Sequence, residues 1–143
     1  MHLLESAVGV LVAALLLPVL VVAARRRVLQ RGGGAIELSL RRPSPVPGRG
    51  WALGVGRFEG DELRWYRMFT LGVRPRRTLQ RRDLHVLHRR APSGREALAL
   101  IEGAVVMECT TAEGRVDLAM DLSAVTGFLA WLESAPPGVR RSP

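Results

Sequence analysis

The sequence predicts an N-terminal transmembrane helix followed by a small, mainly β domain, a barrel or sandwich, closed by a C-terminal amphipathic helix. Three observations predict this fold class. Nineteen residues without a charge run from Ser6 to Ala24. Several short segments between residues 51 and 121 alternate apolar and polar side chains, which is typical of half-buried strands. From Leu122 to Ser134 apolar residues recur at spacings of three and four, which indicates an amphipathic helix.

The uncharged segment from Ser6 to Ala24 has the length of a membrane span. At about 1.5 Å per helical residue it extends about 28 Å, close to the hydrocarbon thickness of a bilayer. A cleaved signal peptide has a basic start, whereas this chain begins Met-His-Leu-Leu-Glu. A soluble core helix is apolar on one face only, whereas this segment is apolar all round. We therefore expect an uncleaved membrane anchor, in which Pro18 is tolerated.

Basic residues predict the orientation of this anchor. Four arginines follow the span closely: Arg25, Arg26, Arg27 and Arg31. Because basic flanks stay on the cytoplasmic side of a membrane, we expect a single-pass protein of the bacterial plasma membrane with its N-terminus outside. The domain would then lie in the cytoplasm. Cys109 is the one cysteine, so no intrachain disulfide can form, which agrees with a reducing compartment.

Composition divides the chain into four parts. Residues 1–24 form the anchor. Residues 25–49 are basic and contain three prolines between positions 43 and 47, which predicts an extended juxtamembrane linker. Residues 50–135 form the mainly β domain with its closing helix. Residues 136–143 are a short basic tail that we expect to be disordered.

The first part of the domain predicts an antiparallel hairpin. Residues 51–58 and 62–70 are the two strands, and Glu59-Gly60-Asp61 is the turn between them. Gly54 and Gly56 share one face of the first strand, which indicates a bend or close packing there. The second strand places three large apolar side chains on one face: Leu63, Trp65 and Phe69.

The rest of the domain predicts further strands before the helix. Residues 71–78 indicate a loop with a short strand, and residues 79–90 indicate a strand ended by Ala91-Pro92-Ser93-Gly94. Residues 96–111 hold two apolar segments on either side of Glu102-Gly103, with good strand formers in the second. Residues 115–121 alternate apolar and polar side chains, which predicts a half-buried strand.

The closing helix has signals at both ends and an apolar stripe. Asp121 or Ser123 can cap its start, and Pro136-Pro137 stops it. We expect Trp131 to pack on the sheet, near the apolar stripe. A helix placed in this way would bury the open end of a small barrel or sandwich.

The formal net charge of +8 is unevenly distributed along the chain. Residues 64–95 carry ten arginines and one acid, whereas residues 96–133 carry seven acids and one arginine. All 21 basic residues are arginine, which we attribute to coding bias rather than to phosphate recognition. One explanation of the arginine-rich stretch is that it pairs with these acids across the sheet. The other is that it forms a surface for a partner.

Several motifs carry a resemblance over nearly the whole chain. They are the anchor followed by arginines, Gly50-Trp51, Trp65-Tyr66-Arg67, Arg76-Arg77, His88-Arg89-Arg90-Ala91-Pro92, and Phe128-Leu129-Ala130-Trp131-Leu132-Glu133-Ser134. The sequence resembles an actinobacterial family of small single-pass membrane proteins of unknown function. Members of that family are commonly encoded beside F-type ATP synthase genes, so the resemblance implies the same gene context here.

The strand number and closing helix are similar to the pleckstrin-homology-like fold. Lipid-binding domains of that fold usually carry basic residues in the first hairpin loop. Here the loop is Glu59-Gly60-Asp61-Glu62, and its acidity argues against a headgroup site of that type. Fold similarity alone does not imply a function.

No residues in the sequence form a catalytic constellation. In a strand, His85 and His88 would lie on opposite faces and could not share a metal ion, so we expect no metal site. Cys109 lies in an apolar segment and is expected to be a core residue. The glycines match neither a phosphate-binding loop nor a dinucleotide fingerprint, and no cofactor is expected.

The sequence therefore predicts a non-enzymatic, membrane-tethered cytoplasmic interaction module. It would dock on a membrane-protein partner or on the anionic inner leaflet. The candidate contact residues are Arg74, Arg76, Arg77, Arg81 and Arg82. A membrane-tethered nucleic-acid binder is the alternative, although nucleic acid is the less expected partner, and an enzyme has the least support.

Overall fold

A computed structural model describes residues 1–31, 34–70 and 72–134. The chain divides into two compact units, Met1–Gly33 and Gly34–Pro143, each of which is considered by itself. The predicted tail at residues 136–143 lies outside the described residues.

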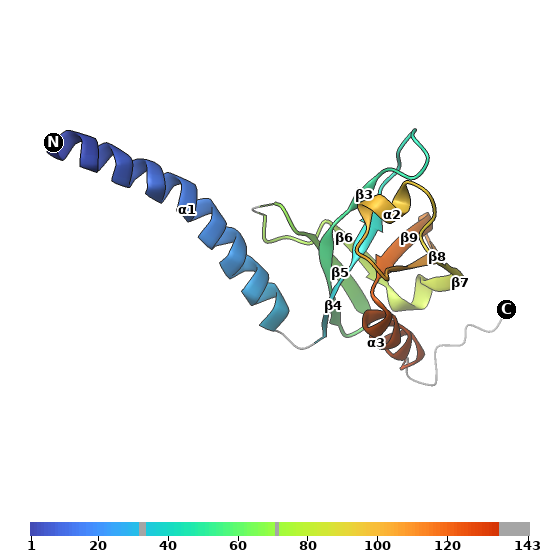
Figure 1. Cartoon of the computed structure of the whole chain (residues 1–143). Coiled ribbons are helices and arrows are strands. Elements are labelled where there is room, and N and C mark those ends of the chain that lie inside the picture. The colour runs from blue at the N-terminus through green and yellow to red at the C-terminus, as the bar shows by residue number, and fades with distance from the viewer. Residues whose placement is uncertain (32–33, 71, 135–143) are drawn as a thin grey trace. The chain divides into compact units, whose positions relative to one another are not determined.

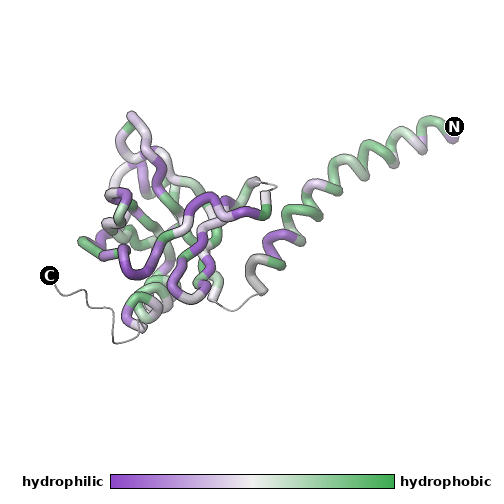
Figure 2. The backbone as a smooth tube through the Cα atoms, turned by 180° about the vertical axis from the view of Figure 1, so that it is seen from behind, coloured by the Kyte–Doolittle hydropathy of each residue, from purple (hydrophilic) through white to green (hydrophobic). Residues whose placement is uncertain are grey.

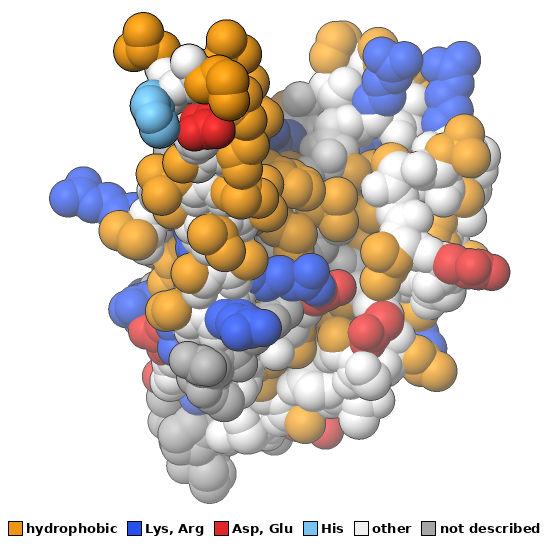
Figure 3. Space-filling view, turned by 60° about the vertical axis from the view of Figure 1, so that its left-hand side comes forward, with side chains coloured by type: hydrophobic (Ala, Val, Ile, Leu, Met, Phe, Trp, Pro, Cys, Tyr) orange, Lys and Arg blue, Asp and Glu red, His pale blue; other side chains and the backbone are white. Residues whose placement is uncertain are grey.

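The first unit is one helix, α1 (His2–Arg31) (Figure 1). It is long and apolar enough between His2 and Val28 to cross a membrane, and its most apolar 18-residue stretch has a mean hydropathy of 2.8 and is not buried by the protein. Figure 2 shows this apolar character along most of the helix, and in Figure 3 hydrophobic side chains cover its visible face. The helix extends beyond the predicted span at both ends. Arg25, Arg26 and Arg27 therefore lie in its last turns rather than beyond it.

The second unit contains two antiparallel sheets (Figure 1). The four strands of the first sheet, in spatial order, are β1 (Ala35–Glu37), β4 (Gly54–Glu59), β5 (Glu62–Arg67) and β6 (Arg77–Gln80). The five strands of the second, in spatial order, are β3 (Trp51–Ala52), β2 (Ser39–Arg41), β9 (Gly114–Met120), β8 (Val105–Thr111) and β7 (His85–Arg90). The described strands pair as two separate sheets and not as a closed barrel.

The described part of this unit also contains three helical segments: the 3-10 turn η1 (Arg81–Asp83), the single-turn helix α2 (Glu96–Ala99) and α3 (Leu122–Glu133). The predicted amphipathic helix is confirmed as α3, whose buried face includes Val125, Phe128 and Trp131. At its start, Asp121 Oδ1 accepts a hydrogen bond from the Ala124 amide at 2.7 Å, which satisfies one of the unpaired amides of the first turn. Side chains from both sheets and α3 form one hydrophobic core.

Strands β1 and β2 correct the predicted linker. Residues 25–49 were expected to form a connector, but residues 35–41 pair with β4, β3 and β9. Leu38 and Leu40 lie in the hydrophobic core. The compact unit consequently begins at Gly34, because the alternation of Ile36, Leu38 and Leu40 supplies one apolar face.

The hairpin is confirmed over β4 and β5, together with close packing at its glycines. The predicted strand 51–58 is divided, however, because Trp51 and Ala52 form β3 in the second sheet. An added Cβ atom at Gly54 would lie 2.4 Å from Trp65 Nε1, and one at Gly56 would lie 2.9 Å from a Leu38 methyl group. The space at Gly54 lets Trp65 Nε1 donate a hydrogen bond to the Leu38 carbonyl at 2.8 Å. The expectation for Phe69 is wrong, because β5 ends at Arg67 and the Phe69 side chain is 73% exposed.

Two further local expectations are corrected. Residues 79–90, predicted as one strand, are divided into the end of β6, the turn η1 and the strand β7. A bulge in β7 lies between Val86 and His88, so His85 pairs with Thr110 and His88 with Glu108. The two histidines therefore share one face, because a bulge changes the alternation of side chains by one residue.

Candidate functional site

The five predicted contact arginines lie in three different parts of the fold. Arg74 and Arg76 are exposed in the loop of residues 68–76 between β5 and β6, called here the β5–β6 loop. Arg77 lies in β6. Arg81 and Arg82 lie in η1. Their chemical surroundings differ, so each group is described separately.

Arg81 is part of the domain's internal packing. Its side chain is only 11% exposed and forms an ion pair with Asp61. One terminal nitrogen, Nη1, donates to the Trp131 carbonyl at 3.1 Å and to Ser134 Oγ at 2.9 Å. The guanidinium carbon also lies 5.4 Å from the centroid of the Trp131 ring, within cation–π range. Arg81 therefore joins η1 and the β4–β5 turn to α3.

Arg82, the adjacent residue, points to solvent. Its side chain is 71% exposed and its Nε lies 3.6 Å from Asp83 Oδ2. An exposed pair of this kind contributes little to stability. Arg82 is thus accessible, but its charge is partly offset by the next residue.

The β5–β6 loop combines exposed apolar and basic side chains. Phe69 and Val73 are 73% and 83% exposed. Arg74 and Arg76 are exposed in the same loop. The base of the loop is fixed to the sheet, because the Arg76 amide donates to the Trp65 carbonyl at 2.8 Å. In Figure 1 the described residues of this loop extend away from the two sheets.

A network of ion pairs covers part of the outer face of the second sheet. Buried Glu96 accepts hydrogen bonds from Arg90 at 2.6 and 3.1 Å and from Arg41 at 3.3 Å. Arg90 also donates to Glu108 at 2.6 Å, and Arg41 to Asp117 at 3.2 Å. The hydrogen bonds from Arg90 lower the pKa of Glu96, and those to Glu96 and Glu108 raise the pKa of Arg90.

This network supports the pairing explanation for part of the arginine-rich stretch. Arg90 pairs with acids from the C-terminal half, and Arg77 Nη2 lies 3.6 Å from Glu113. By contrast, Arg64 pairs within its own hairpin, with Glu59 and Glu62. Sequence reasoning missed Arg41, because it was assigned to the linker.

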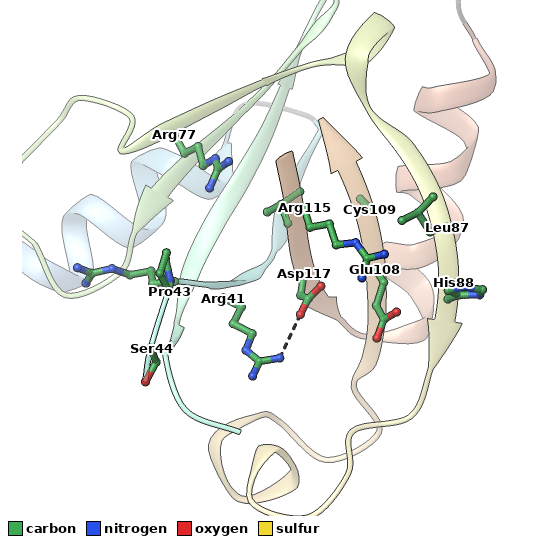
Figure 4. Close-up of a pocket in the computed structure, with 12 residues that line it drawn as sticks. Arg41, Pro43, Ser44, Arg77, Leu87, His88, Glu108, Cys109, Arg115 and Asp117 are labelled. Carbon is green, nitrogen blue, oxygen red and sulfur yellow. Dashed lines mark hydrogen bonds and ion pairs between the residues drawn. The ribbon is translucent and has the colours of Figure 1, made fainter. Parts of the chain in front are cut away.

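A cleft of about 430 Å³ opens beside this network (Figure 4). It lies between β6, the connection that follows β2, and strands β7 to β9. The charged residues of its lining are Arg41, Arg42, Arg77, Glu108, Arg115 and Asp117. Figure 4 shows the Arg41 guanidinium directed at Asp117, with Arg77 approaching from β6. Of the five predicted contact residues, only Arg77 contributes to this lining.

Cys109 has the properties of a core residue, as expected. It is buried, and burial together with the charge of Asp117 raises the pKa of its thiol to about 12. The thiolate nucleophile is therefore strongly disfavoured at neutral pH. His85 and His88 are exposed on β7, and the described part of the chain contains no cluster of three or more side chains suited to a metal ion.

Comparison with known proteins gives a consistent family relationship. The family model described as "Protein of unknown function (DUF2550)" matches residues 11–138. The uncharacterized protein Rv1312 of Mycobacterium tuberculosis strain H37Rv is 41% identical over 138 residues, which are 92% of each chain. The uncharacterized protein ML1147 of Mycobacterium leprae is 38% identical over the same share of both chains. The resemblance to a family of small proteins of unknown function is thereby confirmed, and the chain belongs to the DUF2550 family.

Proposed function

We propose that the protein is a membrane-anchored cytoplasmic interaction module, without enzymatic activity, whose β5–β6 loop docks on the anionic inner leaflet. The observation that carries this proposal is the exposure of Phe69 and Val73 on the same loop as Arg74 and Arg76. Large apolar side chains at a loop tip, beside basic ones, suit the boundary between headgroups and acyl chains.

The energetics of such docking are modest but favourable. Burying one large apolar side chain contributes about 2 kcal/mol. Each arginine near an anionic surface contributes about 1 kcal/mol. The loop has two apolar side chains and two arginines of this kind. Because the arginine contribution is electrostatic, the contact should weaken when the lipid is neutral or the salt concentration is high.

The tether makes this weak contact effective. Three residues, 32–34, separate Arg31 at the end of α1 from Ala35 at the start of β1. Four Cα-to-Cα steps extend at most about 14 Å, at roughly 3.6 Å each. If α1 spans the membrane, the domain is held at its surface and binds at high effective concentration. The arginines at the end of α1 favour the cytoplasmic side for that surface.

We further propose that the domain is a variant of the pleckstrin-homology-like fold with a displaced membrane contact. Two antiparallel sheets and a C-terminal helix that share one core support the comparison. The acidic side chains of the turn between β4 and β5 form ion pairs within the domain. Glu59 and Glu62 pair with Arg64, and Asp61 pairs with Arg81. The β5–β6 loop is the more suitable lipid contact.

Hydrogen–deuterium exchange tests this proposal on the full-length protein in nanodiscs. We expect slower exchange across the β5–β6 loop in phosphatidylglycerol-rich nanodiscs than in phosphatidylcholine nanodiscs. Arg74→Gln with Arg76→Gln should abolish that difference. Arg82→Gln with Arg89→Gln removes the same charge from exposed sites outside the loop and should preserve it. Equal exchange in both lipids would refute lipid docking.

A membrane-protein partner is the alternative target of the same loop. Protection that occurs in native membranes but not in phosphatidylglycerol nanodiscs would favour it. A pull-down from mildly solubilised membranes would then identify the partner. The resemblance described above makes a subunit of an F-type ATP synthase the first one to look for.

A further inference from the structure

We infer that the cleft beside β6 binds a small phosphate-bearing anion through Arg42, Arg77 and Arg115. This site is separate from the β5–β6 loop and does not depend on the function proposed for it. The inference rests on the charges that line the cleft, on the surroundings of Arg77 and on the position of Glu113.

The lining of the cleft has an excess of positive charge. Four arginines line it against two carboxylates, Glu108 and Asp117. Both carboxylates are already engaged, because Glu108 accepts from Arg90 at 2.6 Å and Asp117 accepts from Arg41 at 3.2 Å. The remaining cations of the lining are Arg42, Arg77 and Arg115, of which Arg77 also pairs with Glu113 at 3.6 Å. Arg42 and Arg115 are exposed at the cleft, on the connection after β2 and on β9 respectively.

Arg77 provides the inner wall of the cleft. It lies two residues before Leu79 on β6, so both side chains share the face that contacts the core. Its Nε is shielded from solvent and has no hydrogen-bond acceptor among the described residues. A buried donor without an acceptor is unfavourable, because it loses its hydrogen bonds to water. An anion in the cleft would bind the same guanidinium where the side chain, which is 28% exposed, is open to solvent.

Glu113 forms a long and exposed ion pair with Arg77. It lies in the turn between β8 and β9, its side chain is 82% exposed, and its carboxylate is 3.6 Å from Arg77 Nη2. A ligand with more negative charge would compete well with this exposed pair, which contributes little. A ligand that binds the Arg77 guanidinium would therefore compete with Glu113 for it.

The chemistry of the lining indicates the class of ligand. Guanidinium groups bind phosphate oxygens through two parallel hydrogen bonds, and the presence of three of them around one cleft, rather than the use of arginine itself, favours a phosphate over a single carboxylate. The cleft volume of about 430 Å³ is within the range of small-molecule pockets. Pro43, Leu87 and Val116 also line the cleft and would contact a small organic group attached to the phosphate.

Calorimetric titration of the full-length protein in detergent tests the inference, with pyrophosphate as the probe at constant ionic strength. We expect saturable binding that Arg77→Gln weakens at least tenfold. Arg115→Gln removes a cation from an exposed position and gives a second test should Arg77→Gln fold poorly. Arg89→Gln, at an exposed position outside the cleft, should change the affinity less than twofold. Glu113→Gln should strengthen binding.

Two results would overturn the inference. One is the absence of saturable pyrophosphate binding. The other is wild-type affinity in the folded Arg77→Gln and Arg115→Gln proteins. Repeating the titration in phosphatidylglycerol nanodiscs separates the two sources of phosphate. Competition by the lipid that depends on Arg77 would assign the site to a lipid headgroup, whereas unchanged affinity would assign it to a soluble ligand.

Discussion

The guanidinium of Arg81 lies over the indole of Trp131, with 5.4 Å between the Arg81 Cζ atom and the ring centroid. The same indole donates through Nε1 to the Gly60 carbonyl at 2.9 Å, and its ring centroid lies 5.1 Å from that of Phe58. One tryptophan thus joins α3 to the β4–β5 hairpin and to η1. This arrangement makes Arg81 a structural residue rather than a contact for a partner.

Arg81→Ala is expected to destabilise the domain by about 2 kcal/mol. It removes a hydrogen bond to the Trp131 carbonyl, a cation–π contact and an ion pair from a largely buried side chain. Arg82→Ala is the matched control, and its cost should stay within about 0.5 kcal/mol because Arg82 is exposed. Urea unfolding of the two variants measures both values. Equal midpoints would contradict the structural role of Arg81.

Gly54→Ala is expected to destabilise the domain by about 3 kcal/mol, through overpacking against Trp65. The new methyl group would lie 2.4 Å from the indole nitrogen and 2.5 Å from the Tyr66 carbonyl, so the two strands of the hairpin must move apart.

Gly127→Ala should instead stabilise the domain by about 0.5–1 kcal/mol, because Gly127 lies in α3 with open space around it. Thermal unfolding that ranks the two variants the other way would contradict this packing.

Glu96 should make the folded state sensitive to acid. Its pKa in the folded protein is lowered, first by the hydrogen bonds from Arg90, from an ordinary value of 4.5. A group with a lowered folded pKa stabilises the protein above its unfolded pKa. That stabilisation is lost as the pH falls below about 4.5, through the folded pKa.

The variant Glu96→Gln tests this pH dependence. It should be less stable at neutral pH by about 3 kcal/mol, because Arg90 and Arg41 lose a buried partner. Its stability should fall less steeply below pH 4.5 than that of the wild type. Parallel curves of unfolding free energy against pH would show that Glu96 is not the titrating group.

Cys109 should resist alkylation while the protein is folded. Burial raises the pKa of its thiol to about 12, so little thiolate exists at neutral pH and the sulfur is shielded. Iodoacetamide labelling followed by mass spectrometry should be at least a hundredfold slower for the native protein than in urea. Similar rates in both conditions would place Cys109 outside the core.

Periodic features of the sequence predicted much of the fold. The apolar run of α1, the alternation of β9 and the three-and-four spacing of α3 each reflect local burial, which repeats with the geometry of the element. The strands β1 and β2 were missed, although Ile36, Leu38 and Leu40 alternate, because prolines follow them closely in the sequence. The bulge in β7 was missed because it depends on pairing with β8.

The candidate sites depended more on long-range contacts. Nothing near Arg81 in the sequence indicates its contact with Trp131, fifty residues away. The pairing of Arg41 with Glu96 and Asp117 likewise depends on how β2 is placed beside β9. Phe69 is exposed because β5 ends at Arg67, and the sequence pattern does not show where that strand ends. Charge counts identified the arginine-rich stretch, but not which arginines are internal.

Tryptophan quenching by brominated lipid measures contact between the β5–β6 loop and the bilayer. Phe69→Trp places an indole at an exposed position of the β5–β6 loop, in the full-length protein in nanodiscs containing brominated phosphatidylglycerol. Leu98→Trp is the control, at a position in α2 that is 89% exposed. After subtraction of the native tryptophan signal, we expect strong quenching of the indole introduced at position 69, which high salt reduces, and little quenching at position 98. Equal, weak quenching at both positions would contradict lipid contact by the loop.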